Sequence, residues 1–74
     1  MLKESRNAVL KQVNEVSIHG QISCDLVFTH ADDPEQQLHT ARIGPEAIVG
    51  ALPCAGDRVR IDYLLGVVVQ IARE

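Results

Sequence analysis

The sequence predicts a mostly β domain, a small five-stranded barrel of the OB or SH3-like kind with one short helix between its third and fourth strands. Polar and apolar side chains alternate in residues 21–28, apart from the apolar Val27, and again in residues 58–63. The apolar positions are Ile22, Cys24, Leu26, Phe28, Val59, Ile61 and Tyr63. A period of two is typical of a strand with one face in the core and one in water. Tight Gly turns and a length of 74 residues favour one domain, residues 1–74.

The first element, residues 8–18, fits two patterns. Val9, Val13 and Val16 have helical spacing, whereas Leu10, Val16 and Ile18 share strand parity. We expect a strand with a bulge, ended by Gly20. A long helix packed across a sheet is the alternative.

The middle of the chain contains a loop, a strand and a helix. Residues 29–37 include Asp32, Asp33 and Pro34, and such a polar segment predicts a hairpin loop because Pro cannot continue a hydrogen-bonded ladder. Residues 38–43 are the expected third strand. Pro45 suits the first position of a short helix over residues 45–49, which Gly50 would end.

The C-terminal strand becomes apolar on both faces after Tyr63. The residues concerned are Leu64, Leu65, Val67, Val68 and Val69. An uncovered strand of this kind would be a template for aggregation. A domain of this size buries only roughly 60% of its unfolded surface, so association would also supply stability. We therefore expect these residues to form an interface in a homo-oligomer or with a protein partner.

Composition excludes several classes of function. Seven Lys and Arg against ten Asp and Glu give a net charge of −3, with the cations scattered, which disfavours nucleic-acid binding. No apolar run approaches the roughly 20 residues that cross a bilayer. The first residues do not resemble a signal peptide, so we expect a cytoplasmic protein whose Cys24 and Cys54 are reduced.

Few residues are arranged for chemistry. His19, His30 and His39, with the two cysteines, lack the spacing of any compact zinc motif, and no metal site is predicted. The strand pattern buries Cys24, and no phosphate loop, nucleophile elbow or triad is present. We expect a protein that is not an enzyme.

Two segments resemble the opening of the Mop and TOBE molybdate-binding domains. They are Arg6-Asn7-Ala8-Val9-Leu10-Lys11-Gln12-Val13 and Gly20-Gln21-Ile22-Ser23-Cys24-Asp25-Leu26-Val27-Phe28. Residues 45–52 and Gly56-Asp57-Arg58-Val59 are similar to the short helix and the Gly-Asp-x-Val strand of that family. The resemblance implies a small β-barrel that binds a tetrahedral oxyanion such as molybdate between subunits.

The resemblance also implies a set of ligand-binding residues. Ser5, Arg6 and Asn7 correspond to the Ser-Ala-Arg-Asn segment of the family, and Gly66 lies where its last hairpin carries Lys-Ala-Ser. In this chain that place reads Leu64-Leu65-Gly66, without a cation or a hydroxyl, so the charge of the site would come from Arg6 alone. The sequence therefore leaves two functions open: a small oligomeric oxyanion-binding domain without a certain cofactor, and a ligand-free interaction module that docks through its apolar C-terminal strand.

Overall fold

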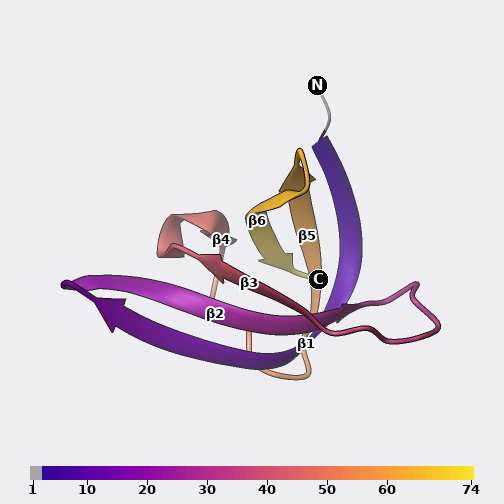
Figure 1. Cartoon of the computed structure of the whole chain (residues 1–74), viewed down its shortest axis with the longest axis horizontal. Coiled ribbons are helices and arrows are strands. Elements are labelled where there is room, and N and C mark those ends of the chain that lie inside the picture. The colour runs from indigo at the N-terminus through magenta and orange to yellow at the C-terminus, as the bar shows by residue number, and fades with distance from the viewer. Residues whose placement is uncertain (1–2) are drawn as a thin grey trace.

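The computed structural model describes residues 3–74, which form strands and one turn of 3₁₀ helix (Figure 1). The strands are β1 (Lys3–Ile18), β2 (Gln21–His30), β3 (His39–Ile43), β4 (Ile48–Val49), β5 (Arg58–Leu64) and β6 (Val67–Arg73). They form a single sheet in the order β3-β2-β1-β5-β6-β4, antiparallel except for the parallel pair β4–β6. The mostly β prediction is confirmed.

The predicted five-stranded barrel is wrong, because residues 3–74 form six strands in a sheet that stays open. The order places β3 at one end and β4 at the other, and these two strands do not pair with each other. The β3 strand has only five residues, bounded by the polar loop before it and by Gly44-Pro45 after it. Closure would require longer and mutually paired edge strands.

The long first strand connects the two halves of the sheet. Residues Ala8 to Ile18 pair with β2, and residues Lys3 to Val9 pair with β5. The register with β2 shifts between Leu10 and Gln12, so the expected strand with a bulge is confirmed and the helical alternative is not found. A bulge bends its strand and increases its twist. The N-terminal half of β1 consequently leaves β2 and forms a three-stranded sheet with β5 and β6, which we call the blade (Figure 1).

The predicted helix over residues 45–49 is wrong in extent. Pro45 begins a single 3₁₀ turn, Pro45–Ala47, and Ile48–Val49 are extended as β4 beside Ile71 and Ala72 of β6. The physical reason is that the β-branched Ile48 and Val49 prefer extended backbone.

The core lies on the inward face of the sheet. Its buried members are Ala8, Leu10, Cys24, Leu26, Phe28, Ile43, Val59, Ile61 and Ile71. The alternation read from residues 24–28 and 59–61 is thereby confirmed. Ile22 is an exception and is 53% exposed, because the pairing of β3 with β2 begins only at Cys24.

The C-terminal apolar run is two strands rather than one. Leu64 ends β5, Leu65 and Gly66 form the turn, and Val67 begins β6. Both turn residues have left-handed backbone, with φ of 52° and 80°. The β6 strand is paired with β5 along its length and with β4 near its end, so its backbone is not the uncovered strand that the sequence indicated. No helix within residues 3–74 has the length and hydrophobicity to cross a membrane.

Candidate functional site

The three predicted ligand residues of β1 point to different faces of the blade. Ser5 pairs with Asp62 of β5, and its Oγ donates a hydrogen bond of 2.6 Å to Asp62 Oδ1. Arg6 is opposite the core residue Ile61, so its side chain starts on the inward face. Because successive side chains of a strand alternate, Ser5 and Asn7 share the outer face. The three side chains therefore start on two faces of the blade, although all three residues border one depression at the edge of β1.

The alternation of residues 58–63 predicts that Asp62, between Ile61 and Tyr63, faces water, and this prediction is wrong. Its side chain is only 5% exposed, and Lys3 Nζ and Arg60 Nε both lie 3.6 Å from its carboxylate. The hydrogen bond from Ser5 lowers the pKa of Asp62, burial opposes the effect, and Lys3 and Arg60 lower the pKa further. The Ser5 hydroxyl is thus engaged within the chain.

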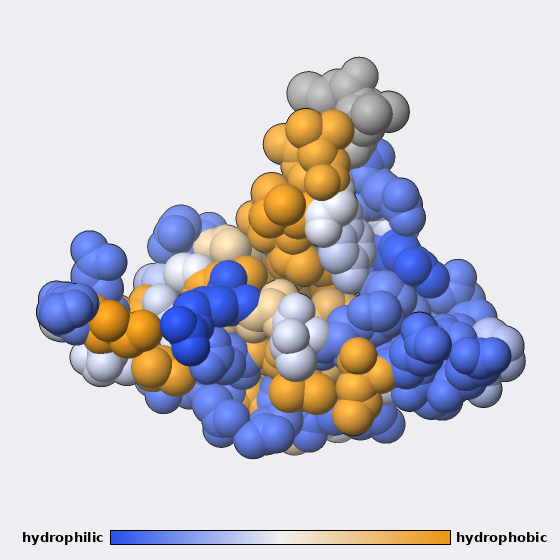
Figure 2. Space-filling model, viewed as in Figure 1, coloured by the Kyte–Doolittle hydropathy of each residue, from blue (hydrophilic) through white to orange (hydrophobic). Residues whose placement is uncertain are grey.

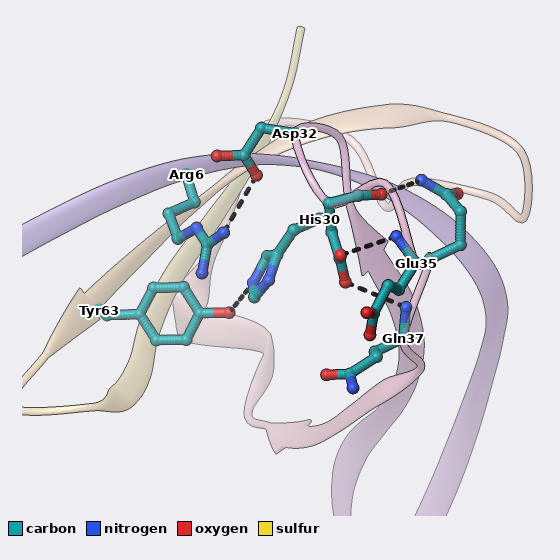
Figure 3. A network of polar contacts seen from close by, with 8 residues as sticks. Arg6, His30, Asp32, Glu35, Gln37 and Tyr63 are labelled. Carbon is teal, nitrogen blue, oxygen red and sulfur yellow. Dashed lines mark hydrogen bonds and ion pairs between the residues drawn. The ribbon is translucent and has the colours of Figure 1, made fainter.

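Arg6 reaches across the end of β2 to the loop that follows it (Figure 3). Its Nη2 donates to Asp32 Oδ1 at 3.0 Å, and this bond lowers the pKa of Asp32. The loop is shaped by Asp33, whose carboxylate accepts from the backbone N–H groups of Glu35 and Gln37 at 3.0 and 3.1 Å. Such a loop holds Asp32 in place for Arg6.

His30 and Tyr63 meet beside Arg6, as Figure 3 shows. His30 Nε2 and the Tyr63 hydroxyl are hydrogen-bonded at 2.8 Å, joining the end of β2 to the end of β5. His30 is 6% exposed. Burial lowers the pKa of His30, and the charges of Arg6 and His39 lower it further against the opposite effect of Asp32 and Asp33. Burial also raises the pKa of Tyr63, so both groups are neutral near pH 7.

A polar hollow of about 260 Å³ opens above these side chains. It is lined by Glu4, Arg6, His30, His39, Tyr63 and Gly66. The His39 ring stacks on Phe28 with 5.7 Å between centroids and lies 4.4 Å from the His30 ring. Two of the predicted ligand residues, Arg6 and Gly66, therefore line one hollow of the same chain.

Sequence reasoning missed His30, His39 and Tyr63 as members of this site. The available signal was parity, because His30 continues the buried positions Leu26 and Phe28 of β2. The neighbouring depression, about 350 Å³, is lined by Ser5, Arg6, Asn7, Ala31 and Asp32. Arg6 borders both spaces and is their shared cation.

The predicted interface residues form a patch at the tip of the β5–β6 hairpin. Leu65 is 73% exposed, Val67 is 63% exposed, and Val69 and Leu64 are exposed to a smaller extent. Val68 differs, because it is half-buried and packs against the core. Figure 2 shows hydrophobic surface gathered over this hairpin. We call Leu64, Leu65, Val67 and Val69 the hairpin-tip patch.

The cysteines and the acidic residues offer little further chemistry. Cys24 is buried, and burial raises its pKa, with smaller contributions from Glu15 and Asp25. Cys54 is exposed. Within residues 3–74 no group of three or more His, Cys, Asp or Glu side chains is placed to hold a metal ion. The polar hollow and the hairpin-tip patch are thus the candidate sites.

Comparisons of the chain with protein families, with curated proteins and with solved structures found no match.

Proposed function

We propose that this protein is a small interaction module that assembles with copies of itself through the hairpin-tip patch. The observation that carries the proposal is Leu65, an apolar side chain 73% exposed at a backbone position with φ of 52°. Left-handed backbone costs a non-glycine residue roughly 1–2 kcal/mol, and Asn before Gly is the favoured pair in such hairpin turns. Folding alone favours Asn at this position, so binding is the physical reason for an exposed leucine there.

The surroundings of Leu65 support the same proposal. From Tyr63 to Ala72 the chain has no charged residue, so the tip of the hairpin carries no charge of its own that would oppose contact with an apolar surface. Burying a Leu or Val side chain fully contributes about 1.5–3 kcal/mol. Four such side chains at one tip form a contiguous docking surface rather than the scattered apolar residues of an ordinary monomer.

Sedimentation velocity tests the proposal with matched variants. Leu65→Asn removes the apolar contact while suiting the turn, so we expect a smaller sedimentation coefficient together with an unchanged circular dichroism spectrum. Leu38→Asn is the control, because Leu38 is 67% exposed but lies in the loop before β3. An unchanged coefficient for Leu65→Asn, or an equal fall for Leu38→Asn, would overturn the proposal. Val68 is a poor choice for this test, since its substitution would disturb the core.

A second candidate function is oxyanion binding, the activity that the resemblance to Mop and TOBE domains implies. The observation in its favour is that Arg6 and Gly66 line the polar hollow together with His39. Glu4 in the same lining and the pairing of Arg6 with Asp32 weaken the attraction for an anion. Calorimetric titration with molybdate, sulfate and phosphate in low salt tests it. Binding that Arg6→Ala removes and Lys11→Ala retains would support this function, and no heat with any anion would contradict it.

A further inference from the structure

Residues 3–6 of β1 have a backbone edge without a neighbouring strand. Arg6 and Ala8 pair with Ile61 and Val59 of β5, and Asn7 O points to the opposite side, where it accepts from Ala31 N–H at 2.9 Å. Hydrogen-bonding direction alternates along a strand, so the N–H and C=O groups of Lys3 and Ser5 also point away from β5. The paired part of β2 begins only opposite Ala8. Within residues 3–74, no strand lies beside residues 3–6 on that side, as Figure 1 shows.

From this edge we infer that a second copy of the chain adds its own β1 antiparallel to the first, with Ser5 opposite the partner's Ser5. The inference does not depend on the proposed function, because it rests on the backbone edge of β1 on the side away from β5, whereas the hairpin-tip patch consists of side chains of the β5–β6 hairpin. Edge strands with unpaired backbone groups are natural templates for strand addition. The depression lined by Ser5, Arg6, Asn7, Ala31 and Asp32 leaves space beside the strand for the incoming backbone.

Among the possible antiparallel registers of two β1 edges, the charges favour the one that is centred on Ser5. With Ser5 at the two-fold axis, each Glu4 lies opposite the partner's Arg6. The new pairing ends there, because Ala31 already lies beside Asn7 on this side. Opposite charges at directly facing positions of an antiparallel pair are favourable. A shift to Glu4 opposite the partner's Glu4 or Arg6 opposite the partner's Arg6 would place like charges together. The segment is therefore complementary to itself only when it is centred on Ser5.

The proposed ion pair between Arg6 and the partner's Glu4 lies on the inward face of the blade. Glu4 and Arg6 both face the side of Tyr63 and the polar hollow, where Arg6 is half-buried. An ion pair with the partner's Glu4 would use the part of the Arg6 guanidinium that does not bind Asp32, since Nη2 alone makes that bond. Arg6 would then connect the loop of its own chain to the strand of the partner.

The test exchanges charges between Glu4 and Arg6 and measures the oligomeric state by sedimentation velocity. All variants also carry Leu65→Asn, so that association through the hairpin-tip patch does not contribute. The ladder is short and would bury less than the roughly 1,200 Å² of a stable interface, so the protein is kept at a concentration on the order of 100 µM in low salt. We expect a dimer for the parent, and monomers for Glu4→Arg and for Arg6→Glu. Mixing these two variants should restore a dimer, because one then presents two cations and the other two carboxylates.

Two charge-matched controls accompany the exchange. Glu35→Arg and Lys11→Glu change the same charges at exposed positions outside the edge and should leave the dimer intact. A monomeric parent, a dimer that survives both single variants, or a mixture that stays monomeric would each overturn the β1 pairing. If Leu65→Asn alone does not lower the mass of the assembly, the proposed function is wrong, whereas the charge exchange still tests the β1 pairing.

Discussion

Replacement of Asp62 by Ala should destabilise the fold much more than replacement of an acid in an exposed ion pair. Asp62 is 5% exposed at its side chain, and Ser5 Oγ donates to it at 2.6 Å across the β1–β5 pair. A hydrogen bond to a charged group contributes about 1.5–3 kcal/mol net. Lys3 and Arg60 add little, because both side chains are more than half exposed and regain water when the carboxylate is removed.

The expected loss for Asp62→Ala is therefore about 2 kcal/mol, which lowers the melting temperature of a domain of this size by about 8–16 °C. Thermal unfolding followed by circular dichroism at pH 7 measures it. Asp25→Ala is the matched control, since Asp25 pairs with Arg42 through bonds of 2.6 and 3.0 Å between exposed side chains. Equal melting temperatures for the two variants would refute the assignment of Asp62 as the buried connection of the blade.

The pH dependence gives a second check on Asp62. Its pKa in the folded state is lowered, so its contribution to stability is present above the unfolded-state value near 3.9 and is lost as the pH falls through the folded-state pKa. The difference in melting temperature between the parent and Asp62→Ala should shrink below about pH 4. A difference that stays constant down to pH 2 would show that packing rather than the carboxylate charge determines the effect.

Three further predictions follow from individual side chains. Leu65→Asn should raise the melting temperature of the unassociated chain, because Asn suits the left-handed turn; a fall in a dilute sample would contradict this. The folded-state pKa of His30 is lowered, so the contribution of its neutral imidazole to stability should be fully present above about pH 6.5 and should decline as the pH falls below it. Urea titrations should show a smaller decline for His30→Gln. Cys54 should react with a thiol reagent in the native protein and Cys24 only after unfolding, and two equally fast thiols would disprove the burial of Cys24.

The elements that the sequence could predict are those in which local pattern and burial agree. Alternation assigned Cys24, Leu26 and Phe28 to the core, and Val59 and Ile61 likewise, because each strand buries a single face. Pro45 marked the correct start of a helical turn but not its length, since Ile48 and Val49 gain more from pairing with β6 than from continuing it. Whether a sheet closes depends on contacts between strands distant in the sequence, which periodicity does not contain.

The candidate site was predictable only in part, because it also depends on contacts between strands that are distant in the sequence. Arg6 and Gly66 were chosen from a resemblance, and the structure brings both to one hollow, but Ser5 turns to Asp62 on the opposite face. Asp62 was predicted to face water because it lies between the apolar residues Ile61 and Tyr63. Asp62 does lie on the face opposite Ile61, as the alternation indicates, but Lys3, Ser5 and Arg60 surround its carboxylate. The pattern of one strand does not show which side chains of neighbouring strands cover its outer face.

The blade combines the features on which both proposed contacts depend. Its two proposed contact surfaces differ: β1 presents backbone groups and charged side chains at residues 3–6, whereas the tip of the β5–β6 hairpin presents apolar side chains. A second copy that bound through one of these surfaces would leave the other accessible. If both proposed contacts form, each copy contacts two others, which predicts assembly beyond a dimer. Removing either surface alone should therefore leave a dimer, and removing both should leave a monomer.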